Sequence, residues 1–368
     1  MTRLKKVLLP ALVIIALIIG CSRSDQQQSE DKSHAGKTFA ANTLPGTLRL
    51  KGAGATFPAL LYEKWFALYM NSHPDIVLQY EPVGSGTGIE RFIGKGVDDD
   101  RRVDFGASDA AMTDAEIAKV ERGVKMIPMT AGGVVLAYNI SGLQGELKLS
   151  REAYAGIFLG KIKDWNDPVI RDCNPGLQLP KMTITVVVRS DGSGTTFAFT
   201  KHLDAISNEW RQKYGPATFI NWPGRAMRAK GNDGVAGAVR QSLGSIGYME
   251  LGYARKLGLP VAAIQNKAGK YIKPSVETAL QSMSSCVLPE NLRLFFPDPE
   301  GPDSYPIVTL TWVLLYDRYD DPKKAEALRN LFDWCLHAGQ AYSEETGYLP
   351  LPEGIVDCST AALKRVSR

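Results

Sequence analysis

The fold is decided by residues 48–73, LRLKGAGATFPALLYEKWFALYMNSH. This stretch opens with a short apolar run at Leu48–Lys51 and passes through a glycine-rich turn, GAGATFP (Gly52–Pro58). In the segment that follows, Ala59–His73, large apolar side chains recur with a period of 3.6 residues, which predicts an amphipathic helix. A strand, a glycine turn and a helix in this order predict one β-α unit of an α/β fold.

The same alternation continues along the chain, and no internal repeat of fixed period is visible. Thr113 and Glu116 form a capping box that opens a helix, and Ser150 caps another. Strands alternating with helices predict mostly parallel sheets flanked by helices. We expect strands at 76–80, 103–107, 134–139, 183–188, 246–249 and 307–315, and helices at 114–122, 150–160, 195–203 and 322–339.

Length and composition favour two globular units. The chain has 368 residues with 44% hydrophobic content, which is more than one core usually serves. Its formal charge is only +4, too small over this length for a protein that coats nucleic acid. Any anion is therefore expected to bind at a local site.

The N-terminus predicts export. Arg3, Lys5 and Lys6 precede a short apolar run, Val7–Ile19, which is typical of a secretory signal over residues 1–20. The junction Ile18-Ile19-Gly20-Cys21 resembles the bacterial lipobox, in which Cys21 is lipidated and becomes the mature N-terminus; the alternative is an uncleaved membrane anchor. Residues 21–42 are polar and predict a flexible tether.

The remaining cysteines and the histidines carry no metal-binding pattern. Four cysteines in an oxidising compartment allow three pairings, of which we favour Cys335 with Cys358 over those using Cys173 or Cys286. Cys-X-X-Cys and His-Glu-X-X-His are absent, and the four histidines are scattered. We expect no metal and no cofactor.

Four segments run from a strand candidate through small polar residues into a helix, a pattern that favours anion binding. A helix start offers unpaired N–H groups and the positive end of the dipole, and glycine lets a ligand approach the backbone. Each segment alone is more often mere helix capping. The four are GAGATFP (Gly52–Pro58), GSGTG (Gly84–Gly88), DFGASD (Asp104–Asp109) and RSDGSGTT (Arg189–Thr196).

Two common interpretations of such segments fail in detail. GSGTGIE lacks the third glycine of the dinucleotide fingerprint, and the chain has no phosphate-binding loop ending in Gly-Lys-Ser/Thr. Ser193 does not lie in a Gly-X-Ser-X-Gly elbow, and no histidine follows a comparable strand to act as its base. A nucleotide site and a serine hydrolase are both disfavoured.

Taken together, the segments resemble the periplasmic phosphate-binding protein of the bacterial Pst-type phosphate ABC importer. The resemblance runs from about Leu48 to the end and includes VDFGASDAAMTD, GGVVLAYNISGL, LGKIKDWNDP, VVVRSDGSGTTFAFT, KGNDGVAG and GSIGYME. It implies a periplasmic-binding-protein fold of two α/β lobes with the ligand cleft between them. We assign residues 43–130 and 304–368 to one lobe and 131–303 to the other, with a crossing near Pro297–Pro302.

The resemblance implies a phosphate site built almost entirely from hydrogen-bond donors. Arg189 would be its only full positive charge, and its planar fork can hold two oxygens. Asp191 would hold the guanidinium in place. Asn232, at the start of another helix, is at least as well explained as a cap. The expected donors are Thr56, Phe57, Ser85, Ser193, Gly194 and Thr195.

Asp109 is the exception, because a carboxylate inside an anion site should repel its ligand. Phosphate still carries a proton near neutral pH and can donate it to Asp109, whereas sulfate would leave the carboxylate buried and unpaired. A polar partner of this kind discriminates between ligands by roughly 10⁴–10⁵. Asp109 therefore predicts selection of phosphate over sulfate.

The sequence thus predicts an exported, lipid-anchored monomer, in the periplasm or at the cell surface, that captures inorganic phosphate. It would hand the ion to an ABC importer's permease and ATPase complex, with no catalysis and no nucleic-acid partner. Three alternatives stay open: a binder of sulfate, molybdate or a phosphonate; a secreted phosphatase using Ser193 or Asp109; and a surface interaction protein that has lost the ligand.

Overall fold

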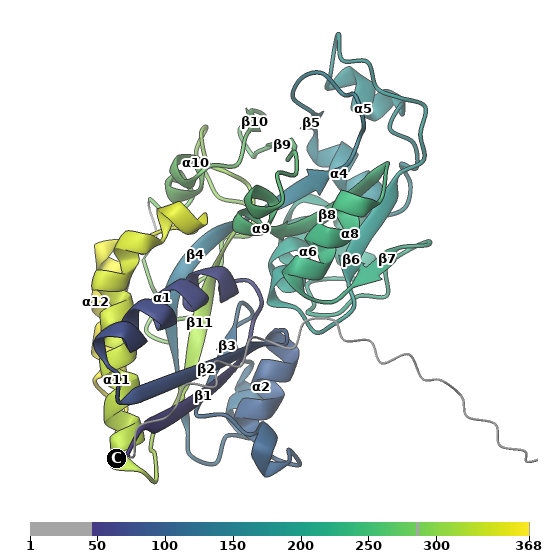
Figure 1. Ribbon diagram of the computed structural model, residues 1–368. Coiled ribbons are helices and arrows are strands. Elements are labelled where there is room, and N and C mark those ends of the chain that lie inside the picture. The colour runs from purple at the N-terminus through teal and green to yellow at the C-terminus, as the bar shows by residue number, and fades with distance from the viewer. Residues whose placement is uncertain (1–45, 285–286, 368) are drawn as a thin grey trace, which may run out of the picture. The chain divides into compact units, whose positions relative to one another are not determined.

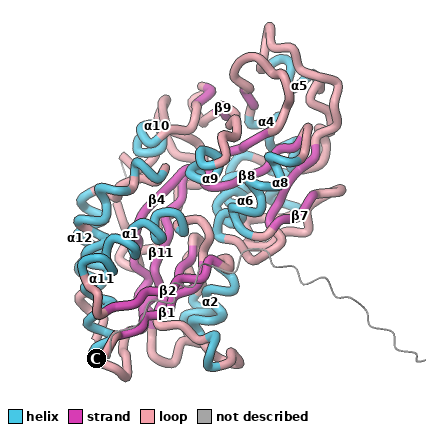
Figure 2. The backbone as a smooth tube through the Cα atoms, viewed as in Figure 1, coloured by secondary structure: helices cyan, strands magenta, loops and turns pink. Residues whose placement is uncertain are grey.

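An eight-stranded mixed sheet organises residues 46–284 and 287–367, the part of the chain that the computed structural model describes. Its order is β2-β1-β3-β11-β4-β8-β6-β7 (Figure 1, Figure 2). The strands are β1 (Leu48–Gly54), β2 (Ile76–Pro82), β3 (Phe105–Ser108), β4 (Val124–Tyr138), β6 (Thr185–Arg189), β7 (Met227–Ala229), β8 (Ser245–Glu250) and β11 (Val308–Tyr316). A small sheet of order β10-β9-β5 contains Tyr271–Ile272, Ala263–Gln265 and Lys148–Leu149.

Twelve α-helices are present within the described residues, and most of the long ones flank the large sheet (Figure 1). They are α1 (Ala59–Ser72), α2 (Ser85–Ile93), α3 (Asp114–Ile117), α4 (Arg151–Phe158), α5 (Pro168–Asp172), α6 (Gly194–Ile206), α7 (Asn208–Lys213), α8 (Gly231–Gln241), α9 (Leu251–Lys256), α10 (Val276–Gln281), α11 (Pro322–Leu336) and α12 (Glu353–Leu363). Short 3₁₀ turns occupy Asp99–Arg101, Ala338–Tyr342 and Glu344–Thr346.

The strand β4 belongs to both halves of the sheet. Its first part pairs with β11 as far as Gly133, and the part from Val134 to Tyr138 pairs with β8, both antiparallel. All residues from Met126 to Tyr138 are buried, because helices or loops cover both faces of the strand. The predicted strand at 134–139 covers only the second part of β4. The parallel pairings are β1 with β2 and β3 in one half, and β6 with β7 and β8 in the other.

Helices cover both faces of the half of the sheet that contains β2, β1, β3 and β11, because successive side chains along each strand point to opposite faces. The Phe105 ring meets Phe66 of α1 and Phe332 of α11, with centroids 5.9 and 5.2 Å away. The next residue, Gly106, points to the opposite face, where a Cβ would lie 3.2 Å from Phe92 of α2. The helices that follow β1 and β2 therefore begin at one edge of the sheet but cover different faces.

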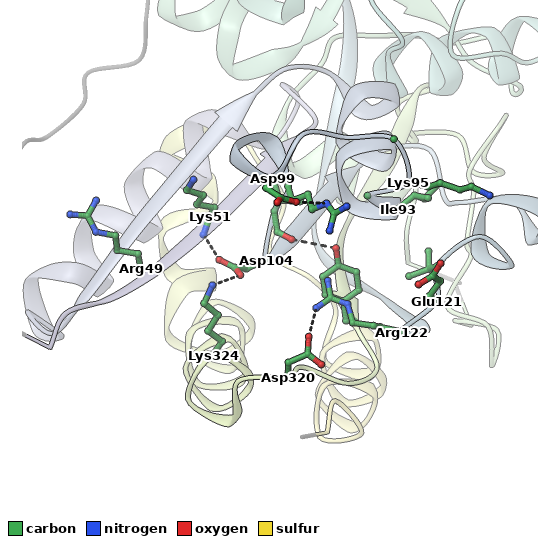
Figure 3. Close-up of a pocket in the computed structure, with 16 residues that line it drawn as sticks. Arg49, Lys51, Ile93, Lys95, Asp99, Asp104, Glu121, Arg122, Asp320 and Lys324 are labelled. Atoms are coloured by element: carbon green, nitrogen blue, oxygen red, sulfur yellow. Dashed lines mark hydrogen bonds and ion pairs between the residues drawn. The ribbon is translucent and has the colours of Figure 1, made fainter.

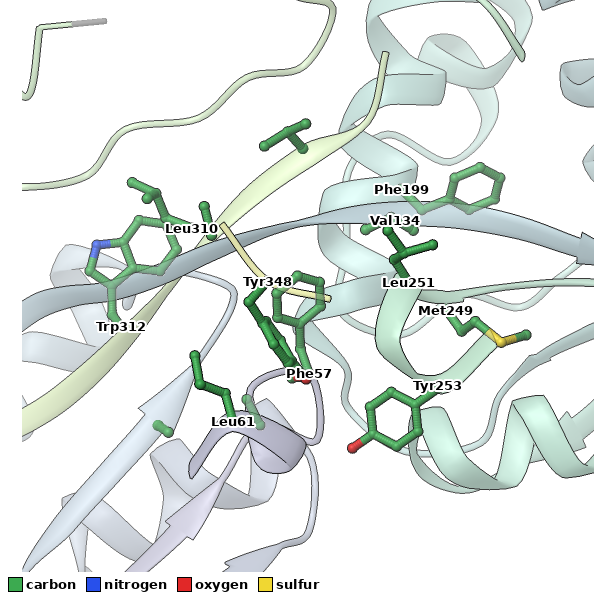
Figure 4. Close-up of a cluster of buried hydrophobic side chains, with 14 of the residues drawn as sticks. Phe57, Leu61, Val134, Phe199, Met249, Leu251, Tyr253, Leu310, Trp312 and Tyr348 are labelled. Atoms are coloured by element: carbon green, nitrogen blue, oxygen red, sulfur yellow. The ribbon is translucent and has the colours of Figure 1, made fainter. Parts of the chain in front are cut away.

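A buried aromatic pair fixes the loop that follows β1. Figure 4 shows Phe57 and Tyr348 beside the start of α1, close to β4 and β11. Their rings meet edge to face at 6.0 Å, and the Tyr348 hydroxyl donates to the Phe57 carbonyl at 2.5 Å. The adjacent Leu349 pairs with Ala131 of β4. The glycine-rich turn is thus tied to the central strand.

Two further predictions differ from the structure. The capping box at Thr113 is present, but its helix ends at Ile117 instead of continuing to residue 122, since the chain turns through Gly123, at a φ of 70°, directly into β4. The favoured disulfide is wrong: Cys335 is buried on α11, Cys358 is exposed on α12, and both are free, as is Cys173. Cys286 lies outside the described residues.

The predictions for residues 1–42, including the signal peptide, Cys21 and the tether, also lie outside the described residues. Among the residues that the structure describes, no helix has both the length and the apolar character needed to cross a membrane.

Candidate functional site

Four helix starts meet where the two halves of the sheet face each other. They are the N-termini of α1, α2, α6 and α8, each of which follows a strand of a parallel pair. The Gly86 N–H of α2 donates to the Gly192 carbonyl ahead of α6 at 2.9 Å, which joins the halves through backbone alone. Helix N-termini that converge in this way gather partial positive charge. The arrangement is suited to an anion.

Ser85, the first residue of α2, is held by N–H groups from both halves. Its Oγ accepts from Asp109 N at 3.2 Å and from Gly194 N at 3.1 Å. Gly194 is required here, since a Cβ would lie 2.6 Å from Ser85 Oγ and from Asp109 Cβ. Three predicted residues are thus in direct contact, although the Gly194 N–H that we expected to face an anion is used by Ser85.

Asn232 links two more predicted residues. Its side-chain Nδ2 donates to Thr56 Oγ1 at 2.9 Å and to Thr195 Oγ1 at 3.1 Å, and its backbone N–H also donates to Thr56 Oγ1, at 3.1 Å. Its Oδ1 accepts from the Glu250 backbone N–H at 3.0 Å. The side chain is completely buried. The interpretation of Asn232 as a cap is wrong, because its side chain bonds other elements and not the amides of α8.

These contacts fix which way the hydroxyls donate. A hydroxyl has two acceptor lone pairs and one proton. Thr56 Oγ1 and Ser85 Oγ each already accept two N–H groups, so each must use its proton to donate. Thr195 Oγ1 accepts one N–H, and Ser193 Oγ accepts the Thr196 N–H at 3.0 Å as the N-cap of α6. The hydroxyl groups of the site are therefore arranged mainly as hydrogen-bond donors.

Arg189 and Asp191 form a buried two-point ion pair. Nε and Nη2 of Arg189 lie 2.8 and 2.5 Å from the two carboxylate oxygens of Asp191, which also accepts the Gly231 N–H at 3.1 Å. The Arg189 side chain is only 2% exposed. Its Nη1 is buried without a partner among the described residues, which leaves one edge of the guanidinium unused. Although burial opposes ionisation, the hydrogen bonds from Arg189 and its charge leave the pKa of Asp191 lowered.

Asp109 is the buried acceptor of the site. Its Oδ1 accepts the Thr311 hydroxyl of β11 at 2.8 Å. Burial raises its pKa to about 7, against the lowering effects of the Thr311 hydrogen bond and the Arg189 charge. Near neutral pH this carboxyl therefore exists both as an acceptor and as a protonated donor.

Glu250 is a second buried carboxyl close to these groups. It ends β8, and its Oε1 accepts the Gly252 N–H at 2.8 Å as the N-cap of α9. Burial raises its pKa to about 8. Tyr253, in the first turn of α9, donates its hydroxyl to the Thr56 carbonyl at 2.6 Å. The start of α9 thus supports the loop after β1.

The structure links most of the predicted residues: Asn232 joins Thr56 to Thr195, Ser85 contacts Asp109 and Gly194, and Arg189 pairs with Asp191. Phe57 follows Thr56 in the chain and packs its ring against Tyr348.

The sequence analysis does not identify Thr311 or Glu250, and it does not decide between a cap and a site residue for Asn232. Thr311 gives no local signal, because it lies 202 positions from Asp109, the residue that it supports. Glu250 follows an apolar strand without any motif that would mark its side chain as buried. Asn232 is the second residue of α8, directly after Gly231, and this glycine-led helix start is the signal that marks it. Within the described residues, no cluster of acidic, histidine or cysteine side chains could hold a metal.

Comparison with known proteins assigns this fold to a family. Residues 28–338 match the family model of the PBP superfamily domain. The chain is 37% identical over 344 residues to the phosphate-binding protein PstS of Xylella fastidiosa, which covers 92% of each chain. The chain belongs to the PstS phosphate-binding proteins of this superfamily.

PstS proteins of other organisms are also similar to this chain. That of Haemophilus influenzae is 39% identical over 83% of this chain and 90% of its own, and that of Methanocaldococcus jannaschii is 37% identical over 88% of each. Among solved structures, a high-affinity periplasmic phosphate-binding protein with bound phosphate matches with a TM-score of 0.73 at 22% identity, over 85% of this chain and 93% of that one. The phosphate-binding protein of Stenotrophomonas maltophilia gives 0.68 at 20%, over 86% and 94%. These structures support the α/β periplasmic-binding-protein fold.

Proposed function

We propose that this PstS family member captures inorganic phosphate outside the cytoplasm and delivers it to the permease and ATPase complex of an ABC importer. The observation that carries this proposal is a buried set of hydrogen-bond donors, one arginine and a single acceptor, Asp109. Such a set matches an ion that has several unprotonated oxygens and one proton to donate. The PstS relatives are named as phosphate-binding proteins, which agrees with this chemistry.

Each predicted residue then has a defined role. The free edge of Arg189 meets phosphate oxygens, and the two hydrogen bonds to Asp191 fix the orientation of the guanidinium. Asp109 accepts the phosphate proton, with its other oxygen fixed by Thr311. The loop of Thr56 and Phe57, together with Ser85, Ser193 and Thr195, supplies hydroxyl and backbone donors. Gly194 acts indirectly, because its N–H donates to Ser85 Oγ and holds that hydroxyl in place. Binding needs no bond making, so the protein acts as a carrier and not as an enzyme.

The proposal is tested by isothermal titration of phosphate, and then of sulfate, into residues 22–368. This segment keeps the whole of the compact unit, residues 42–368. Unfolding and refolding before the titration removes bound ligand. One phosphate per chain with no heat from sulfate supports the proposal. Absence of heat from phosphate, with well-folded protein, contradicts it and favours the interaction-protein alternative.

The same preparation tests the other two alternatives. If sulfate, molybdate or a phosphonate binds in preference to phosphate, the protein is a carrier of that anion and not of phosphate. Turnover of a chromogenic phosphoester at high protein concentration would indicate a phosphatase. An Asp109→Asn variant should then lose turnover, whereas a carrier shows none to lose.

We also propose that the body is anchored by lipid. Residues 1–20 act as a signal peptide, Cys21 is lipidated, and residues 21–42 tether a monomer with lobes at 43–130 plus 304–368 and at 131–303. A division close to 130/131 is supported by β4, which pairs with β11 up to Gly133 and with β8 from Val134 onwards. Partition into detergent, lost in a Cys21→Ser variant, is the expected result. Equal partition of both forms contradicts lipidation.

A further inference from the structure

A basic cavity lies at the edge of the sheet where the strands β1, β3 and β4 begin. Its volume is about 870 Å³. Figure 3 shows Arg49 and Lys51 on β1, Lys95 after α2, Arg122 ahead of β4 and Lys324 on α11 around it. Six of its sixteen lining residues are basic and four are acidic.

A second cavity of about 400 Å³ shares Arg122 and extends the positive charge. It adds three basic residues, Lys125, Arg318 and Arg365, and one acidic residue, Asp317. The two adjoining cavities therefore have nine basic and five acidic residues, an excess of four positive charges. We call the two together the basic edge. This excess equals the net charge of the entire chain, +4, so the charges of all the other residues cancel. The net positive charge of the protein is therefore concentrated at the basic edge.

The acidic residues of the basic edge are mostly neutralised locally. Lys324 Nζ lies 2.7 Å from Asp104, and the Arg122 guanidinium stacks on the Tyr316 ring at 3.5 Å while pairing with Asp320 at 3.8 Å. By contrast, the exposed side chains of Lys95, Arg318 and Arg365 have no hydrogen-bond or ion-pair partner among the described residues. These three cations are available to an external anion.

The basic edge is separate from the candidate phosphate site. Arg49 and Lys51 lie near the start of β1, whereas Thr56 follows its end, and Asp104 and Asp109 flank β3 in the same way. A strand of seven residues spans about 20 Å. The basic edge is also where the chain enters the described residues, since Leu48 is two residues from Gly46, and Ser367 near the C-terminus lines the second cavity.

We infer that the basic edge docks on anionic phospholipid headgroups. The inference rests on the proposed anchor: a lipid at Cys21 and a tether ending beside β1 bring this edge, before any other, within reach of the membrane. About 20 residues of flexible chain span roughly 25 Å. A lipid anchor combined with a basic patch is a common two-signal mode of membrane attachment, and each Lys or Arg adds attraction to anionic lipid. Several facing cations fit a dense array of phosphodiesters better than one small ion.

The test uses residues 22–368, which lack the lipid, in flotation with phosphatidylcholine vesicles that contain phosphatidylglycerol or none. We expect binding only to the anionic vesicles at about 20 mM salt, and its loss at about 0.5 M, where the screening length falls to a few Å. A Lys95→Glu, Arg318→Glu, Arg365→Glu variant should bind at least about tenfold more weakly. A matched control with the same change of charge is Lys163→Glu, Lys181→Glu, Arg225→Glu, at exposed positions elsewhere.

Three outcomes would overturn the inference: no binding of the unaltered chain to anionic vesicles, equal binding to neutral vesicles, or equal weakening by the test and control variants. Phosphate titration of the same samples separates this from the proposed function. The test variant should bind phosphate with unchanged affinity, because its substitutions lie about a strand length from the site. Vesicle binding without phosphate binding would reject the carrier role and leave the docking surface intact.

Discussion

The Nδ2 atom of Asn232 lies 2.9 Å from the Thr56 hydroxyl oxygen, so the start of α8 is bonded to the loop after β1 from the other half of the sheet. Thr56 Oγ1 also accepts the Asn232 backbone N–H, so both of its lone pairs are occupied. The Thr56 hydroxyl can therefore only donate its proton to a further partner. Asn232 thereby sets the polarity of a proposed phosphate donor without needing to touch the phosphate.

Reversing that polarity should harm phosphate binding more than removing the amide. In Asn232→Asp the carboxylate accepts from the Thr56 and Thr195 hydroxyls and turns their protons away from the ligand. We expect phosphate affinity to fall at least about 100-fold, against about tenfold for Asn232→Ala, since each misdirected or lost hydrogen bond to a charged group is worth about 1.5–3 kcal/mol. Titration calorimetry measures both.

The added charge of Asn232→Asp could act on phosphate directly, and a Thr56→Val background separates the two effects. If Asn232 acts through Thr56, the additional loss caused by Asp shrinks in that background. An undiminished loss would point to simple repulsion and contradict the polarity explanation.

Selectivity against sulfate should depend on pH. With a pKa of about 7, Asp109 is mostly ionised at pH 8 and mostly protonated at pH 6. Protonated Asp109 can donate to sulfate, so sulfate affinity should rise about tenfold as pH falls across this range. In Asp109→Asn, sulfate binding should appear at pH 8 and stay constant with pH. Sulfate titrations at several pH values measure this, and a flat profile in the unaltered protein would count against Asp109 as the selecting group.

Glu250 should make the protein less stable as pH rises. Its pKa is about 8 in the folded chain against about 4.5 ordinarily, so the folded state binds more protons between these values. Stability from this group is complete below about pH 4.5 and is lost as pH rises through 8.

Glu250→Gln removes this ionisation. We expect it to be more stable than the unaltered chain at pH 8, on the order of 1–3 kcal/mol, and nearly equal at pH 5. Denaturant unfolding at the two pH values provides the comparison. The surface variant Glu209→Gln is the control. An equal effect of Glu250→Gln at both pH values would show that packing, and not ionisation, is responsible.

Arg189→Lys should behave differently from a surface Arg→Lys change. Lysine keeps the charge but cannot hold both oxygens of Asp191, which would leave a buried carboxylate incompletely paired. We expect a loss of about 1–3 kcal/mol in stability and at least tenfold in phosphate affinity. Arg102→Lys is the control, because Arg102 pairs with Asp99 at the surface and their side chains are 57% and 94% exposed. Equal effects of the two would indicate that the fork geometry is unimportant.

Much of the fold was accessible from sequence because its signals are local. The period of α1 predicted Ala59–His73, and the structure ends that helix at Ser72. The sequence predicts only the second part of β4. Both faces of this strand are buried, so the alternation of polar and apolar residues that marks a strand is missing, and Pro128 interrupts the apolar run.

The candidate site was predictable where motifs carry it and hidden where tertiary contacts do. Arg189 and Asp191 are two residues apart, so their pairing could be proposed directly. Thr311 reaches Asp109 across 202 positions, a contact that only the antiparallel pairing of β11 with β3 creates. Asn232 showed a helix start, but its four hydrogen bonds depend on three other elements meeting.

The sharing of β4 also decides how far the two halves are independent of each other. If the chain were divided between the halves, the fragment that kept β4 would expose an unpaired strand edge. In the other fragment, β8 or β11 would lose the strand with which it pairs. The halves therefore cannot be exchanged as modules between relatives without transplanting this strand. The protein should melt in a single cooperative step, with no half surviving alone.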